Sequence, residues 1–473
     1  MMSEIKVEKL EGKEKVVGRK GTQTTTNIAN VVNAADAQLF PSLYAQVQST
    51  LGLGVLQLGL ITGARTFAQS IFTPLWGWWS DKYSRKRVLS AGCFFWAIST
   101  FLMAFSVQYI DLFIFRLLTG IGLAVIVPTA QSLIADYYPP EERGKAFGIL
   151  GLTGVIGIII GTIFATALVT GTKYIFGIDS WRFVFVIWGI LSVIVGILVL
   201  IFAKDPIRGE MEPELAKTIT REKAEEYKIK KSDIKKIVKN RTFLLIALQG
   251  IVGSIPWNGI LFMIIWFQYI GFDPLTAGLM FSLIAIGAAF GSVLGGWLGD
   301  KAAKWNPEKG RIMIAQISVF SGIPLTLVIF LIIPMHPTSI VFYIIFGALT
   351  GLLITWCGGG CNSPIYSEIF EPEIRGTAFS INRLLEGSFA ALGTILVGLV
   401  AAFYGYQTPP LGTDISSLPE AIRIRNMRAL AQGMFLVAVI PWTLCLIFYT
   451  FVYKTYLKDS EKIRKILAQR GKM

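Results

Sequence analysis

The chain has 473 residues, of which 53% are hydrophobic and only 16% charged, and its mean hydropathy is +0.59. Because a soluble protein carries about 25% charged residues, this composition excludes a water-soluble protein and indicates an integral membrane protein. The single histidine excludes the histidine clusters of zinc, haem and Ser-His-Asp sites. We therefore expect no metal, no cofactor and no enzymatic activity.

Apolar stretches of about 20 residues, long enough to cross a roughly 30 Å hydrocarbon core, follow one another along the chain. A weaker stretch at 28–50 contains Asp36 and several Asn and Gln residues, and hydropathy alone does not identify it as a span. We include it as the first span partly because of the family resemblance described below, with its polar side chains tolerated if they face a water-filled cavity. The sequence thus predicts an all-α membrane protein with twelve transmembrane helices. The other eleven stretches are 54–79, 88–106, 112–136, 146–170, 183–203, 243–269, 275–298, 312–334, 339–367, 377–404 and 429–453.

The basic residues predict the orientation of these spans. If both termini are cytoplasmic, the segments on that side contain 36 of the 44 Lys and Arg residues, which is the positive-inside pattern. This pattern explains the net charge of +14 without nucleic acid. The predicted parts are a cytoplasmic N-terminal arm (1–27), a six-helix bundle (28–203), a cytoplasmic linker (204–242), a second six-helix bundle (243–453) and a cytoplasmic tail (454–473).

Two short segments recur in the two bundles, each where a span meets the cytoplasm. GWWSD at 77–81 has a counterpart 219 residues later in GWLGD at 296–300, and an acidic residue seven positions before Arg-Gly also recurs. Repeated halves of this kind place a substrate at their interface near the midplane. Acidic and basic side chains at the span ends predict a cytoplasmic latch, with turn caps and topology determinants as the alternative. The residues are Gly77, Asp81, Arg85, Arg87, Asp136, Arg143, Gly296, Asp300, Glu368 and Arg375.

These motifs resemble those of the major facilitator superfamily over essentially the whole chain. The family's loop signature, G-x-x-x-D-R/K-x-G-R/K-R/K, matches residues 77–86, with Ser84 in place of the second Gly. The family's fourth-span Arg followed by G-x-G matches Arg116, Gly120 and Gly122. The resemblance implies a secondary transporter with two six-helix bundles.

Within that family the chain looks most similar to the spinster-like branch. The features are an Asn-rich first span with Asp36, Trp181-Arg182 at the start of the sixth span, and the segment DPIRG at 205–209. Two positions depart from the spinster pattern: Ala37 stands where Arg is usual, and Leu123 where Glu is usual. The branch implies lysophospholipid or sphingoid substrates, which the two departures do not support.

Three ionisable residues lie within the spans of the first bundle: Asp36, Arg65 and Arg116. A charge at membrane depth costs about 2.5–3.5 kcal/mol or more, so such residues are functional candidates. Asp36 is the candidate for a proton-coupling site with the two arginines beside it. A permanent ion pair that only holds helices together is the alternative.

The second bundle offers a candidate substrate pocket. Arg383 and Glu386 share a helical face of the eleventh span, where Arg383 suits an anionic or zwitterionic group and a local ion pair is the alternative. Trp257 and Asn258 in the seventh span, and Asn362 in the tenth, lie where Pro and Gly interrupt the helices. Interrupted helices expose backbone to ligands in carriers, whereas packing or lipid contact is the ordinary role of Trp.

Four glycines of the fifth span, Gly151, Gly154, Gly157 and Gly161, lie on one face and favour the close approach of a neighbouring helix.

These observations predict a secondary transporter in the cell membrane that moves a small organic solute, anionic or amphipathic and lipid-like, by alternating access with proton coupling. The sequence has no G-x-x-x-x-G-K-S/T loop for ATP. The expected partners are membrane lipids, the small-molecule substrate and protons, with no nucleic acid, and the chain is expected to be a monomer. A ligand-binding membrane sensor and a facilitator without ion coupling are the alternatives.

Overall fold

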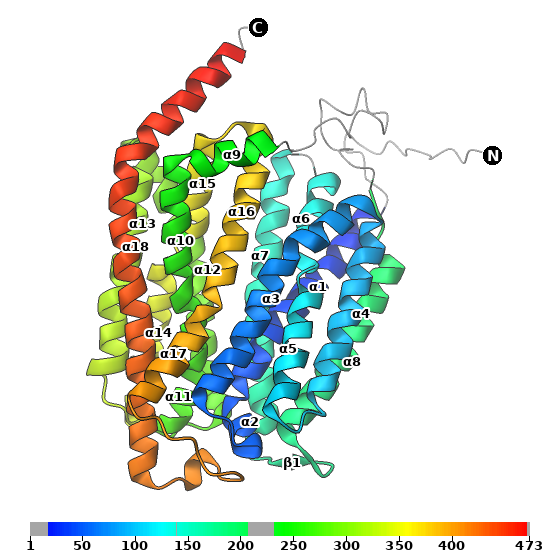
Figure 1. The fold of residues 1–473 in the computed structure, drawn as a ribbon, viewed down its shortest axis with the longest axis vertical. Helices are drawn as coiled ribbons and strands as arrows, with labels where there is room; N and C mark the ends of the chain where they lie inside the picture. Colours follow the sequence, from blue (N-terminus) through cyan, green and yellow to red (C-terminus); the bar gives the residue numbers. More distant parts are fainter. Residues whose placement is uncertain (1–17, 139, 207–230, 471–473) are drawn as a thin grey trace, which may run out of the picture.

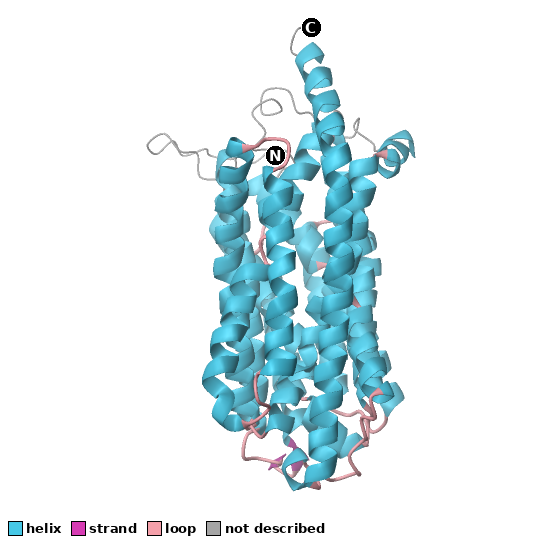
Figure 2. Cartoon of the chain, turned by 90° about the vertical axis from the view of Figure 1, so that its left-hand side faces the viewer, coloured by secondary structure: helices cyan, strands magenta, loops and turns pink. Residues whose placement is uncertain are grey.

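The computed structural model describes residues 18–138, 140–206 and 231–470. These residues form a bundle of long helices that run approximately along one direction (Figures 1 and 2), together with one short hairpin, β1 (Tyr174–Ile175) and β2 (Ile178–Asp179). Both ends of the described chain lie at the same end of the bundle, which we call the terminal end (Figure 1). The hairpin lies at the other end, which we call the opposite end.

The first half of the chain crosses the bundle six times. Its helices are α1 (Arg19–Ser42), α2 (Tyr44–Leu51), α3 (Val55–Lys82), α4 (Arg85–Met103), α5 (Tyr109–Leu123), α6 (Ile126–Tyr137), α7 (Pro140–Val169) and α8 (Ser180–Phe202). The first crossing breaks at Leu43, next to Pro41, so that α1 and α2 follow each other.

The second half also crosses six times, after a short helix α9 (Lys231–Lys239) in the linker. Its helices are α10 (Arg241–Gly259), η2 (Ile260–Phe262), α11 (Met263–Ile270), α12 (Pro274–Trp305), α13 (Gly310–Leu327), η3 (Val328–Ile332), η4 (Pro337–Ser339), α14 (Ile340–Ile354), η5 (Gly358–Asn362), α15 (Ser363–Ile369), α16 (Pro372–Ala390), α17 (Leu392–Phe403), η6 (Ile415–Ser417) and α18 (Glu420–Arg470). The predicted interruptions near Pro256 and the glycines at 358–360 are present as the 3₁₀ turn η2 and the π-helical turn η5.

Nine of the helical passages in the described chain are long and apolar enough to cross a membrane by length and composition alone. The other three passages, formed by α1 with α2, by α3 and by α4, run beside them (Figure 1) and contain more polar or charged residues. The all-helical, two-times-six arrangement agrees with the prediction. Two helices run beyond the predicted boundaries, because α1 begins at Arg19 and α18 continues to Arg470.

Small residues bring the two halves together along a seam. A Cβ at Gly59 of α3 would lie 2.4 Å from the carbonyl oxygen of Thr394 on α17, and one at Gly278 of α12 would lie 2.5 Å from Oγ1 of Thr166 on α7. Because only glycine leaves room for such contacts, α3 packs on α17 and α7 on α12.

Within the first half, two of the four aligned glycines make such a contact. A Cβ at Gly157 or Gly161 would meet the backbone of α1, whereas one at Gly151 would meet nothing within 4 Å.

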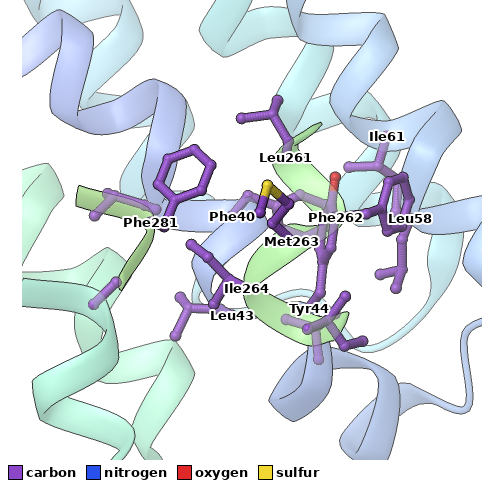
Figure 3. Close-up of a cluster of buried hydrophobic side chains, with 14 of the residues drawn as sticks. Phe40, Leu43, Tyr44, Leu58, Ile61, Leu261, Phe262, Met263, Ile264 and Phe281 are labelled. Carbon is purple, nitrogen blue, oxygen red and sulfur yellow. The ribbon is translucent and has the colours of Figure 1, made fainter. Parts of the chain in front are cut away.

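Apolar side chains from both halves fill the seam toward the opposite end (Figure 3), where α2 and α11 lie. The rings of Tyr44 and Phe262 meet there with centroids 4.8 Å apart. We call this cluster the apolar plug. It consists of Phe40, Leu43, Tyr44, Leu58 and Ile61 from the first half and Leu261, Phe262, Met263, Ile264 and Phe281 from the second.

Candidate functional site

The three charges of the first half form one cluster. Arg116 Nη1 donates to Asp36 Oδ1 at 2.8 Å, and Arg116 Nη2 donates to the Asp36 carbonyl oxygen at 3.0 Å. The second carboxylate oxygen accepts from Thr100 Oγ1 at 3.1 Å. The side chains of Asp36 and Arg116 are both 0% exposed, so the pair is sealed within the first half.

Arg65 adds a second cation to this cluster. Its Nε lies 3.7 Å from Asp36 Oδ1 and has no hydrogen-bond partner among the described residues. Gly120 makes this arrangement possible, because a Cβ there would lie 2.3 Å from the carbonyl oxygen of Arg65, so α5 and α3 are in backbone contact. Two guanidinium groups face one carboxylate, and the cluster carries one excess positive charge.

The burial of Asp36 differs from the water-filled surroundings that its sequence context predicts. Ion pairing satisfies the carboxylate in this conformation, with no exposed surface left to water. The same geometry serves both roles considered for Asp36, a proton-coupling site and a structural ion pair.

Arg383 and Glu386 do not form the local ion pair that their spacing permits. Within the described chain, neither side chain has an ion pair or a hydrogen bond. Glu386 is half-buried against α10, where a Cβ at Gly250 would lie 2.2 Å from its Oε1. Arg383 is exposed and lies one turn from Gly387, whose face of α16 touches Ser70 of α3. Arg383 is thus an unpaired, exposed cation of α16, one turn from Gly387, which touches α3, and one turn from Phe379, which packs on Tyr366 of the second half.

Asn362 is engaged inside the second half. Its Nδ2 donates to Gln249 Oε1 at 3.0 Å, and its Oδ1 accepts from Tyr449 at 2.8 Å. Asn362 ends the π-helical turn η5, and both of these partners belong to the second half. Trp257 and Asn258 are half-buried at the end of α10; Trp257 packs against the core of the second half, and Asn258 contacts α17 near Gly393.

Ion pairs at the terminal end join helices within each half. In the first half Arg85 pairs with Asp136 and is almost fully buried. Arg87, in the first turn of α4, donates its backbone N–H to Oγ of the capping residue Ser84. Gly77 lies near Pro128 of α6. The side chains of Asp81 and Arg143 lie outside what the structure describes.

In the second half the central cation is Arg311. Its Nη1 lies 2.9 Å from Asp300 Oδ1, and its Nε lies 3.6 Å from Glu368 Oε1. Glu368 also accepts from Tyr456. Arg375 donates to the carbonyl oxygen of Phe370 at 3.1 Å, so it is not the partner of Glu368.

A Cβ at Gly296 would meet nothing within 4 Å, although a Cβ at Gly360 would lie 2.8 Å from the backbone nitrogen of Gly296. The described residues contain no cluster of His, Cys, Asp or Glu that would hold a metal ion.

Comparison with known proteins agrees with this architecture. A family model described as Major Facilitator Superfamily matches residues 26–394. A solved structure of a bacterial homologue of the human lysosomal transporter Spinster, in an inward-facing and unoccupied conformation, superposes with a TM-score of 0.79 at 22% identity and covers 94% of this chain and 98% of its own.

Curated relatives are similar at about the same level. Protein spinster of Drosophila melanogaster is 26% identical over 51% of this chain and 39% of its own length. Multidrug resistance protein 3 of Bacillus subtilis is 25% identical over 92% of this chain and 95% of its own length. A probable sulfoacetate transporter of Cupriavidus necator is 25% identical over 58% of this chain and 62% of its own length. The chain therefore spans less than two thirds of the length of the Drosophila and Cupriavidus proteins.

Proposed function

The chain belongs to the Major Facilitator Superfamily and is a multi-pass membrane transporter of small solutes, and from this premise we propose that it carries a small organic anion by proton-coupled alternating access. The proposed class of substrates, small organic anions, includes amphipathic acids. The sensor alternative would bind the same ligand without net flux, so flux separates the two.

The distribution of contacts between the halves supports alternating access. At the opposite end, Gly412 of the second half donates its N–H to the carbonyl oxygen of Ser49, and Tyr406 donates to Gln48. At the terminal end, the ion pairs of Arg85 and Arg311 close each half on itself. Halves that pack along a seam and are hydrogen-bonded to each other at the opposite end are suited to rocking about that seam.

One exposed cation of α16 supports an anionic substrate. Arg383 is unpaired and lies one turn from the contact of Gly387 with α3, and a guanidinium binds carboxylate or sulfonate in a bidentate manner. The similarity to a probable sulfoacetate transporter points to the same class. Arg383 is the observation on which the substrate class depends.

The Asp36 cluster supports proton coupling. Asp36 is a carboxylate inside a membrane protein, and its partners come from three other helices: Thr100 on α4, Arg116 on α5 and Arg65 on α3. A movement that separates these helices would change the electrostatic balance of the carboxylate. We propose that such a rearrangement of helices within the first half accompanies the rocking of the halves, and that Asp36 takes up and releases the coupled proton in it.

Flux in proteoliposomes tests the proposal. A pH gradient is expected to drive accumulation of radiolabelled organic acids, sulfoacetate among them, by the wild-type protein, and Asp36→Asn is expected to abolish accumulation while equilibrative exchange continues. Unchanged accumulation in Asp36→Asn would remove Asp36 from coupling. Absence of flux with every acid, together with ligand binding, would favour the sensor.

The complete burial of the Asp36 ion pair favours one second candidate, a facilitator without ion coupling. In that case the pair is permanent, and the wild-type protein equilibrates its substrate regardless of the pH gradient.

We also propose that both termini are cytoplasmic, because most Lys and Arg residues lie on the terminal side of the predicted spans.

A further inference from the structure

One buried amide, Gln48 of α2, accepts hydrogen bonds from two residues of the other half. Its Oε1 accepts from the hydroxyl of Tyr406 at 2.8 Å and from that of Tyr269 at 3.2 Å. Gln48 is 1% exposed and Tyr269 is 0% exposed. These hydrogen bonds cross the seam between the halves, at the opposite end.

The second half holds the two tyrosines in place. Their hydroxyl groups lie 2.8 Å apart, and Asn426 of α18 donates to Tyr269 at 3.3 Å. The same Asn426 side chain binds both the N–H and the carbonyl oxygen of Gln407 at 2.8 Å, which fixes the segment that carries Tyr406. We call Gln48, Tyr269, Tyr406 and Asn426 the gate cluster.

The loop that carries Tyr406, residues 404–419, makes further contacts with the first half. Gly412 N–H donates to the Ser49 carbonyl oxygen at 2.8 Å, and Ser49 Oγ donates to Asp414 Oδ1 at 3.1 Å. Lys173 lies 3.7 Å from Asp414, but both side chains are about half exposed. This ion pair therefore contributes little to the stability of the contact between the halves. The loop therefore rests across the seam, with its buried contact at Gln48.

Gln48 also belongs to a stripe along the first crossing. Asp36 and Phe40 on α1, and Tyr44 and Gln48 on α2, follow each other at intervals of four residues on the two sides of the break at Leu43, over about 18 Å. The Arg116 guanidinium lies over the Phe40 ring at 5.7 Å, and the Tyr44 ring meets Phe262 of the second half. The stripe thus connects the charge cluster, the apolar plug and the gate cluster in that order.

Burial raises the pKa of the Tyr406 hydroxyl well above its usual value, the neighbouring Tyr269 adding to this effect. Tyr406 lies outside the spans, and its hydroxyl stays protonated at every physiological pH. It can therefore donate its hydrogen bond to Gln48 throughout this range.

We propose that Gln48 is a gating residue for transport: its hydrogen bonds with Tyr269 and Tyr406 hold the opposite end closed, and they must break for that end to open. This inference rests on the alternating access proposed above. In this role Gln48 controls the opening of the opposite end by its hydrogen bonds across the seam, and it does not contact the substrate.

Distance measurements between spin labels at positions 176 and 338 test this proposal. Phe176 and Thr338 are exposed at the opposite end, one in each half, and the labels are placed in a background without the four native cysteines. Gln48→Leu is expected to raise the population with the opposite end open by roughly tenfold, the effect of two net hydrogen bonds. Tyr343→Phe is the matched control, because Tyr343 bonds Pro334 at the same end but within one half.

A double-mutant cycle separates gating from simple loss of stability. Tyr406→Phe alone is expected to raise the open population severalfold, but to change it much less in the Gln48→Leu background, since the shared hydrogen bond is already absent. If Gln48→Leu does not fold, the shift in Tyr406→Phe against Tyr343→Phe decides the matter.

Open populations in Gln48→Leu or Tyr406→Phe equal to those of the wild type would overturn the gating role. A wild-type protein that never opens at this end, and carries no flux, would overturn the proposed transport cycle instead.

Discussion

Oδ1 of Asp36 lies 2.8 Å from Nη1 of Arg116, and neither side chain is exposed to solvent. A buried pair of this kind costs desolvation energy, and removal of one partner leaves an uncompensated charge. This relationship leads to a prediction about stability that is independent of transport.

Arg116→Met is expected to destabilise the protein by about 1–3 kcal/mol, because Asp36 loses its closest hydrogen-bond donor while Arg65, 3.7 Å away, still balances its charge. The double variant Arg65→Met/Arg116→Met leaves the buried carboxylate without either cation and is expected to cost about 3–5 kcal/mol. Equilibrium unfolding in detergent measures both. A double variant as stable as the single one would show that Arg65 does not compensate the charge of Asp36.

The contact of α7 with α1 predicts a sharp difference between two glycines of the same helix. Gly161→Ala is expected to lower the melting temperature strongly, because the new Cβ would lie 2.4 Å from the carbonyl oxygen of Ala35. Gly151→Ala is the matched control. It meets open space and is expected to be neutral or to stabilise the helix by up to about 1 kcal/mol. Equal effects in the two variants would contradict this packing.

The two acids beside Arg311 are expected to differ in importance. Asp300 is 67% exposed and Glu368 only 30%, and exposed ion pairs contribute about 0–1 kcal/mol. Glu368→Gln should therefore lower the melting temperature more than Asp300→Asn, since it also weakens the contact with Tyr456. The reverse order in thermal unfolding would argue against this assignment.

Arg383→Gln is expected to raise the KM for the transported acid by roughly 10- to 100-fold, the range that a charge-assisted hydrogen bond provides. Arg383→Lys keeps the charge without the bidentate geometry and should be intermediate. Arg428→Gln is the control, because Arg428 is an exposed cation near the start of α18, at the opposite end of the bundle. An unchanged KM in Arg383→Gln would exclude Arg383 from substrate binding.

The sequence predicts the helical passages well because each needs a run of apolar side chains long enough for the membrane. It also identifies Asp36, Arg65 and Arg116 as a group, since charges are rare in such runs and must find partners there. The geometry of the group depends on Gly120, which brings α5 against the backbone of Arg65.

Other parts of the site cannot be read from the sequence. Gln48 looks like a polar interruption of a weak span, and its partners Tyr269 and Tyr406 are 221 and 358 residues away. Arg311 is recognisable as one of the basic residues after the second copy of the repeat, but its role is not. The interval from Asp300 to Arg311 is longer than that from Asp81 to Arg85, so a constant offset of 219 residues does not align the two arginines.

The most direct test of the account is the accumulation of a radiolabelled organic acid in proteoliposomes under an imposed pH gradient, with the wild-type protein and Asp36→Asn side by side. The account predicts accumulation above equilibrium in the wild type and only equilibration in Asp36→Asn. Accumulation to the same level in both, with the variant folded, would contradict it.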